Sequence, residues 1–180
     1  MAYTFQNPTL GYSPIAVVDS GVTPPNSATA IPTPPASLGQ VVVATDPTYG
    51  TGEFICLAGV ASTAIGSLVV YDGTTFATTL TTGTGLANSG RPVAVAMSAN
   101  TAATTFGWYQ IGGTAVVKKT TVAIAAKTTL GVNTAVGAIG ASASGKQILG
   151  ARTANAATVA SATTTITVVI NRPHVMGRVT

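Results

Sequence analysis

The chain has 180 residues, of which 46% are hydrophobic but only 7% are charged, against roughly 25% in an average soluble domain. A surface so poor in charge is unsuited to a free monomer, so the composition favours a protein that works within an assembly. The apolar runs at residues 41–44 and 93–97 are far shorter than the roughly 20 residues of a membrane-spanning helix, so we expect no membrane partner.

The N-terminus and the cysteine usage indicate where the chain is made. Its first residues, MAYTFQ, show neither a basic start nor an apolar stretch, so we expect no secretory signal. Cys56 is the only cysteine, so no disulfide can form within the chain. We therefore expect synthesis in a reducing cytoplasm.

The charges are divided along the chain. All four acidic residues precede Phe76, and all eight lysines and arginines follow it. Three interpretations stay open: complementary surfaces of neighbouring subunits, a basic face for an acidic partner, or scattered charges that only solvate loops.

Residues 1–39 predict an extended arm, because seven of the ten prolines lie there. Proline lacks a backbone N–H and restricts the residue before it, so neither a regular helix nor a central strand is expected. Disordered spacers are normally poor in aromatic residues, yet this arm carries Tyr3, Phe5 and Tyr12. We therefore expect these three side chains to pack on a neighbouring subunit.

Residues 40–180 predict one β domain, in which short segments rich in Val, Ile, Thr and aromatic residues alternate with turn signals. Asp72-Gly73 predicts a hairpin, and residues 46–50 predict another turn. The Ala-rich residues 151–162 contain too much Thr and Asn for a helix and predict a loop. The fold class is thus all-β: a small antiparallel β-sandwich or barrel-like domain preceded by the arm. The expected strands are residues 41–45, 53–58, 68–71, 75–79, 93–98, 106–111, 115–119, 147–152 and 164–171.

The stretch at residues 105–117 is expected at the centre of this domain, because it holds the only tryptophan in a strand-like alternation. One face would carry Trp108 and Gln110, and the other Tyr109 and Ile111. Residues 52–59 show a similar pattern around Phe54, so the predicted core comprises Phe54, Trp108 and Ile111. The Gly112-Gly113 pair predicts a sharp turn or a bulge, after which a second strand begins.

Two glycine-rich stretches resemble nucleotide-binding loops without completing the motif. The first, GASASGKQ at residues 140–147, has Gln147 in place of the hydroxyl that would bind magnesium, and no carboxylate follows Asp72. The second, GTGLAN at residues 83–88, lacks the third glycine and the βαβ setting. Both predict ordinary loops.

The chain also lacks the residues that most catalytic sites need. One histidine, His174, and one cysteine, Cys56, make no local cluster of metal ligands. They can form a nucleophilic pair only if the fold brings them together, and Cys56 sits mid-strand where a small buried residue is expected. Four acids give little room for acid–base chemistry. We expect no enzyme, no metal and no cofactor.

Nucleic-acid binding receives weak support. Trp108 and Tyr109 lie near Lys118 and Lys119, but eight dispersed basic residues form no continuous run, and the aromatic residues fit a core. No direct contact with nucleic acid is expected.

Four stretches, in this order and spacing, resemble the small capsid decoration (cement) proteins of tailed bacteriophages. The resemblance covers roughly residues 40–152 and rests on strand and turn residues. The stretches are YGTGEFICLAGVAST from Tyr49, GSLVVYD from Gly66, RPVAVAMS from Arg91 and FGWYQIGG from Phe106.

The resemblance implies a non-enzymatic virion protein on the outer surface of the head. Such proteins bind the major capsid protein, stabilise contacts between its subunits and are usually oligomeric, with a trimer favoured and a dimer possible. A low-charge surface suits such contacts, and an extended arm carrying Tyr3, Phe5 and Tyr12 suits strand addition to a capsid or neighbouring subunit. The alternative is a β-sandwich receptor- or glycan-binding module of a tail fibre or adhesin, whose aromatic residues would be exposed for stacking.

Overall fold

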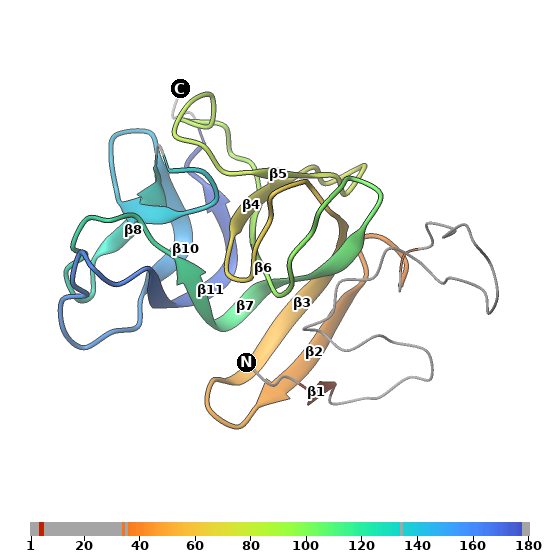
Figure 1. Cartoon of the computed structure of the whole chain (residues 1–180), viewed down its shortest axis with the longest axis horizontal. Coiled ribbons are helices and arrows are strands. Elements are labelled where there is room, and N and C mark those ends of the chain that lie inside the picture. Colours follow the sequence, from red (N-terminus) through yellow and green to blue (C-terminus); the bar gives the residue numbers. More distant parts are fainter. Residues whose placement is uncertain (1–3, 6–33, 35, 134, 178–180) are drawn as a thin grey trace.

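A computed structural model describes residues 4–5, 34, 36–133 and 135–177 of the chain. These residues form an all-β domain in which one antiparallel sheet curls into a half-barrel (Figure 1). This confirms the predicted fold class. In this part of the chain no helix is long and apolar enough to cross a membrane.

In the described residues, eleven strands make up the sheet. They are β1 (Thr4–Phe5), β2 (Val41–Asp46), β3 (Gly50–Ala58), β4 (Leu68–Tyr71), β5 (Thr78–Leu80), β6 (Val93–Ala96), β7 (Phe106–Lys118), β8 (Thr129–Val132), β9 (Ile139–Ala141), β10 (Gln147–Thr153) and β11 (Thr165–Val175).

Strand β7 joins the two halves of the domain. Its first part pairs with β3 on one side and with β6 on the other, where Gln110 lies opposite both Phe54 and Val95. Its second part pairs with β11, from Gly112–Asn171 to Lys118–Thr165. The strand order β1-β2-β3-β7-β11-β10-β8-β9 therefore runs through β7, while β6, β4 and β5 branch from it.

The alternation of β7 sorts its large side chains into different apolar clusters, as the sequence predicts. Trp108 packs with Phe54, Cys56 and Met97, whereas Tyr109 and Ile111 belong to a second cluster on the opposite face. Phe54 and Trp108 are completely buried, and Ile111 is 3% exposed. The residues expected in the core therefore lie in it.

The largest apolar cluster, however, lies in the second half of the domain, away from the expected centre. It is built from aliphatic side chains of β4, β6, β7, β8, β9, β10 and β11, with Leu130, Ile148 and Val168 among its fully buried members. Aromatic residues mark the first half of the core in the sequence, but the second half consists of Val, Ile and Leu and has no such marker.

The prediction of two strands separated at Gly112-Gly113 is wrong in part. One continuous strand runs from Phe106 to Lys118, and the bulge that was the other expectation lies at Ile111, directly before the glycine pair. The register shifts there, because Glu53 lies opposite Gly112 whereas Phe54 lies opposite Gln110. Gly113 has φ 91°, so the strand bends without ending.

Several strand boundaries also differ from the prediction. Strand β5 begins at Thr78 instead of residue 75, because the six residues after Tyr71 form the connection from β4. Strands β8 and β9 were not predicted; they place Gly131 opposite Gly140, and glycines provide no side-chain alternation. Residues 154–162 form a loop between β10 and β11, as expected for most of the Ala-rich stretch, but residues 151–153 belong to β10.

Aspartates fix two of the hairpin turns. The Asp46 carboxylate accepts hydrogen bonds from the backbone N–H groups of Thr48 (2.7 Å) and Tyr49 (2.9 Å). The Asp72 carboxylate accepts the N–H groups of Thr74 and Thr75, both at 2.8 Å. Both turns were expected from their sequences, and aspartate occupies them because its short side chain can bond to the following backbone.

Truncating Phe54 should show whether the aromatic part of the core holds the fold together. Phe54→Ala removes a completely buried ring and should lower the free energy of unfolding by about 3–5 kcal/mol. Ile65→Ala is the control, because that side chain is 62% exposed and its loss should change little. Urea unfolding followed by the fluorescence of Trp108 measures both; equal midpoints would contradict the assignment.

Candidate functional site

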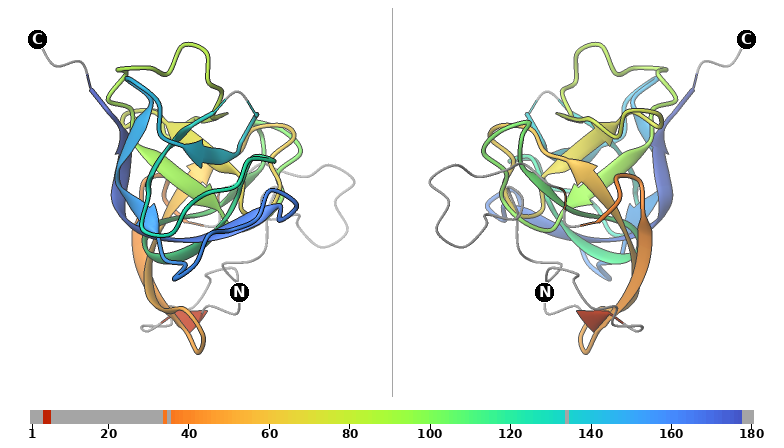
Figure 2. Two further views of the ribbon diagram at one scale, coloured as in Figure 1. Left: turned by 90° about the vertical axis from the view of Figure 1, so that its left-hand side faces the viewer. Right: turned by 90° about the vertical axis from the view of Figure 1, so that its right-hand side faces the viewer.

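The outer edge of β2 is one of the open edges of the sheet. Only β1 pairs with β2 on that side, with Thr4 opposite Thr45 and Phe5 opposite Ala44. In the described residues no strand covers the edge at Val41 and Val43. Both side chains are unusually exposed for valine, at 42% and 40%. The β2–β3 hairpin extends from the body of the domain (Figures 1 and 2).

The hydrogen-bonding pattern shows which backbone groups this edge presents. The Gln40 carbonyl accepts the N–H of Cys56 (3.0 Å), which fixes the phase of the β2–β3 ladder. Alternate residues of an antiparallel strand bond to opposite sides, so the backbone groups of Val41 and Val43 point away from β3. An exposed apolar strand with such groups is a template for pairing with another chain.

The structure places the predicted arm residues only in part. The backbone of Phe5 lies in β1, beside the edge of β2, whereas Tyr3 and Tyr12 lie outside the described residues. The last residues assigned to the arm lie on the β domain: Ala36 and Leu38 pack against the cluster around Trp108. The Gly39 N–H donates to the Cys56 carbonyl (2.8 Å).

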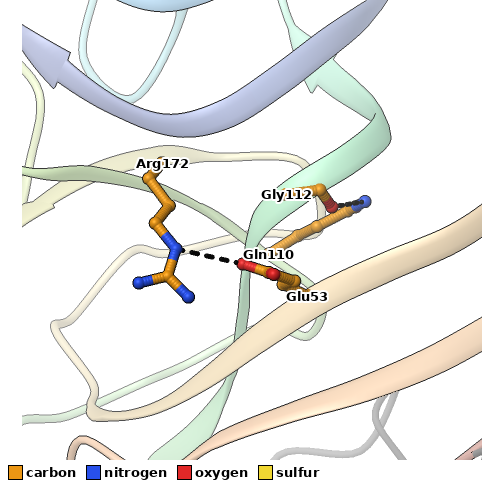
Figure 3. Close-up of polar contacts among 4 residues, drawn as sticks. All are labelled: Glu53, Gln110, Gly112 and Arg172. Carbon is orange, nitrogen blue, oxygen red and sulfur yellow. Dashed lines mark hydrogen bonds and ion pairs between the residues drawn. The ribbon is translucent and has the colours of Figure 1, made fainter.

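The bulge of β7 lies beneath an ion pair that sequence reasoning did not anticipate (Figure 3). Arg172 Nε and Glu53 Oε2 are 3.2 Å apart. Glu53 lies on β3 opposite Gly112, and Gly112 lies opposite Asn171 on β11. A Cβ at Gly112 would come within 3.1–3.4 Å of the Glu53 side chain, so glycine gives the carboxylate its room.

Gln110 closes the same bulge from the interior. Its Nε2 donates to the carbonyls of Gly112 and Thr114, both at 3.0 Å, and the side chain is completely buried. A bulge leaves backbone groups out of the regular ladder, and this amide bonds to two of them. Gln110 is therefore a structural residue, although its strand position alone would suit an apolar side chain.

Strands β10 and β11 are irregular at the same level of the sheet. Leu149 lies opposite His174 and Ala151 opposite Ile170, so three residues of β11 face Gly150 alone. Arg172, within this bulge, has φ 42°, and Gly150 has φ 73°. Irregularities thus follow one another across β7, β11 and β10, and they aim Arg172 toward Glu53.

The described acidic groups are all engaged within the chain. Asp46 is buried and bonds to its own turn, and Glu53 is paired with Arg172. The backbone N–H groups of Thr75 and Thr74 lower the pKa of Asp72, which also lies near Arg91. Glu53 belongs to the acidic half of the sequence and Arg172 to the basic half. The division of charge along the sequence is therefore explained in part by an ion pair within the chain.

Cys56 is poorly suited to nucleophilic chemistry. It is completely buried beside Phe54 and Trp108, and its Sγ lies 3.7 Å from the Ala36 carbonyl oxygen. Burial raises the pKa of its thiol to about 11. His174 is exposed at the far end of β11. In the described part of the chain no hydrogen bond joins Cys56 and His174, and no three His, Cys, Asp or Glu residues gather as metal ligands.

The two glycine-rich stretches meet each other in space. The Asn88 N–H donates to the Gly145 carbonyl (2.8 Å), so the loop before β6 contacts the β9–β10 turn. Gln147 begins β10 directly after this turn, where a phosphate-binding loop would require a helix. Both stretches are loops, as expected.

The residues considered for nucleic-acid binding are mostly buried. Trp108 and Tyr109 are completely buried, and the Tyr109 hydroxyl accepts a hydrogen bond from Asn100 Nδ2 (3.0 Å). Lys119 is 6% exposed, and its Nζ donates to the carbonyls of Thr120 and Thr163. These side chains hold the structure together and offer no stacking surface.

No known protein family, curated protein or solved structure matches this chain.

Substituting Gly113 should show how strongly the domain depends on the bend of β7. Gly113→Ala places a Cβ on a residue with positive φ, which is unfavourable, and brings that Cβ too close to the Thr51 carbonyl. Gly50→Ala is the matched control, since Gly50 has φ 73° but nothing within 4 Å of its Cβ position. We expect Gly50→Ala to cost about 1–2 kcal/mol and Gly113→Ala about 3 kcal/mol or more. Chemical denaturation measures the free energy of unfolding of both variants. Equal losses would mean that the backbone at Thr51 moves away from the added Cβ without a free-energy cost.

Alkylation should test the chemistry of Cys56. Since the thiol is buried and its pKa is about 11, iodoacetamide at about pH 8 should leave native protein unmodified. Urea-unfolded protein should react at the rate of an ordinary thiol. Mass spectrometry of both samples over time measures the difference. Rapid modification of the native protein would show an accessible thiolate and reopen the case for a catalytic cysteine.

Proposed function

We propose that this chain is a structural virion protein that binds the outside of a phage head and stabilises contacts between major capsid protein subunits. It acts as a homo-oligomer, with a trimer favoured and a dimer possible. It performs no catalysis, needs no cofactor and makes no direct contact with nucleic acid. It is synthesised in the host cytoplasm and functions on the capsid surface.

The open edge of β2 is the observation that carries this proposal. An extended segment that pairs with Val41 and Val43 would continue the sheet, and main-chain hydrogen bonds would supply much of the affinity. The two exposed valines would add apolar contact area. Strand β1 shows that this edge accepts an added strand, since Thr4–Phe5 already pair with its other end.

The composition supports the same proposal. Charged side chains are depleted at the centres of protein interfaces, and only 7% of this chain is charged. The acidic groups among the described residues are engaged internally, so the surface depends on Thr, Ala and backbone groups for its contacts. Such a surface fits a subunit that spends its working life bound to others.

The alternative, a receptor- or glycan-binding module, receives less support. Sugar stacking needs exposed aromatic faces. Among the described aromatic side chains, Phe54, Trp108 and Tyr109 are buried and Tyr49, Tyr71, Phe76 and Phe106 are partly buried.

Removing the arm should separate folding from assembly. Deletion of residues 1–33 takes away β1 but keeps Ala36 and Leu38, which pack on the core. We expect the truncated protein to keep the β-type circular dichroism of the full chain and to lose co-sedimentation with purified phage heads from its source. A full-length protein that stays monomeric in light scattering and ignores the heads would refute the proposal.

A charge on the edge should have a similar effect without any truncation. Val43→Lys places a cation on the open strand, which should weaken strand addition and reduce head binding. Val136→Lys is the matched control, because that valine is 59% exposed in a loop away from the edge. Equal head binding by the two variants would mean that the β2 edge is not the contact.

A further inference from the structure

Two exposed basic side chains share one hollow of the surface. In the described residues Lys127, Arg152 and Arg172 are the exposed cations, and Arg172 is paired with Glu53. The other two line a hollow of about 400 Å³ together with Asn155 and Val169. A second hollow of about 450 Å³, over β10 and β11, adjoins it through Arg152 and Val169.

The backbone brings these cations together from distant parts of the sequence. Lys127 lies in the β7–β8 connection, and the next residue, Thr128, donates its N–H to Thr153 Oγ1 on β10 (3.1 Å). Lys127 itself has φ 55°, a left-handed conformation that costs energy for any residue with a Cβ. The bond between Thr128 and Thr153 thus brings Lys127 and Arg152 to the same hollow.

The loops around the hollow are fixed before any ligand arrives. Ile124 and Val159 exchange backbone hydrogen bonds of 3.0 and 2.9 Å, which joins the β7–β8 loop to the β10–β11 loop. Buried Lys119 adds bonds from its Nζ to the Thr163 carbonyl (2.8 Å). A preformed site of this kind loses little conformational entropy on binding.

Asn155 adds hydrogen-bond donors to the two charges. Its Oδ1 accepts the N–H of Thr167 (3.2 Å), which orients the amide and leaves its NH₂ group for another partner. The remaining walls are small and apolar, including Ala154, Ala156 and Val169. Two cations, an amide and a small apolar wall suit a carboxylate on a short aliphatic stem.

A second copy of this chain is a poor source of that carboxylate. Among the described acids, Asp46 is buried and Glu53 is paired, so a second copy offers the exposed Asp72 alone, whose Oδ1 bonds to its own turn and which lies near Arg91. A polyanion such as nucleic acid would need a track of cations along its phosphates, and the hollow offers two. The chemistry therefore favours acidic side chains of a different polypeptide.

We infer that the cationic hollow formed by Lys127, Arg152 and Asn155 is a docking site for an acidic segment of a partner protein. The inference deepens the proposed function and rests on it only in identifying that partner as a subunit of the shell. Residues from the basic half of the chain would then make a contact separate from the one at the β2 edge.

The test is a titration of the full-length, ¹⁵N-labelled protein with a short blocked peptide of alternating Glu and Ala. The backbone amides of Lys127, Arg152 and Asn155 should shift, and the matching Gln–Ala peptide should shift none of them. Raising NaCl from about 0.02 M to about 0.3 M should weaken binding, because the contact is electrostatic. Shifts confined to other basic residues, or no shifts, would overturn the inference. Tighter binding of heparin or a DNA oligonucleotide at these residues would assign the hollow to a polyanion instead.

Matched variants make the result independent of folding defects. Lys127→Asn removes the charge and keeps a residue that tolerates the left-handed backbone. Together with Arg152→Gln, it should lower peptide affinity about two- to fivefold per substitution. Lys146→Gln removes one positive charge outside the hollow and should leave the peptide affinity unchanged. Equal losses of affinity in all three variants would mean that only the net charge of the protein matters.

The same variants separate this inference from the proposed function. If they bind the peptide normally and also bind phage heads normally, the hollow is not a docking site, although the protein still decorates heads. If the wild-type protein binds the peptide at the hollow but ignores heads, the site stands and the proposed function fails.

Discussion

The fold depends on one strand being able to change partners without ending. Strand β7 pairs with β3 as far as Gly112 and with β6 at Tyr109 and Gln110, and it pairs with β11 from Gly112 onward, so each half of the domain is built on a different part of it. The change of partners coincides with a bulge, where Ile111 is the extra residue of β7 and the strand bends. Gly113, at φ 91°, supplies the bend, and its lack of a Cβ lets the Thr51 carbonyl approach. Gln110 then bonds to the carbonyls that the bend takes out of the ladder. The apolar clusters on both faces form around this junction.

Several of the few charges in this domain constrain the backbone. Asp46 and Asp72 fix turns, Lys119 joins two loops, and the Glu53–Arg172 pair spans β3 and β11 above the bend. The pair is exposed enough that its own contribution to stability is small, about 0–1 kcal/mol. Its importance is geometric, because it lies where three strands are irregular together. Apart from these contacts, the described residues present a surface with few charges, the edge of β2 at Val41 and Val43, and the exposed cations Lys127 and Arg152.

The sequence predicted the elements that carry side-chain patterns and missed those that do not. Alternation in the first part of β7 and in β3 was sufficient to find both strands and to assign Trp108 and Tyr109 to opposite faces. Strands β8 and β9 were not predicted, because Gly131 and Gly140, which lie opposite each other, have no side chains that could show an alternation. The glycine pair in β7 was compatible with either a turn or a bulge, because its conformation depends on which strand pairs with it.

The local sequence around Lys127 and Arg152 gives no indication that the two residues lie close together. They become neighbours through a bond between Thr128 and Thr153 and through the docking of two loops, which are properties of the folded chain.

The strand order gives the two candidate contacts different places on the sheet. The β2 edge stands near one end of the order, and the cationic hollow lies on β10, separated from β2 by β3, β7 and β11. Their chemistry differs as well, since a strand edge offers backbone bonds that salt screens little, whereas exposed cations offer attraction that salt weakens. A protein that stabilises the contact between two neighbours has to touch both of them. If each surface is weak alone, holding both partners at once makes the second contact effectively intramolecular and raises the overall affinity without any new interaction. Two modest and unlike surfaces on one rigid sheet would therefore bridge a shell more selectively than one large apolar face, because only a correctly assembled pair of neighbours presents both partners at the right separation.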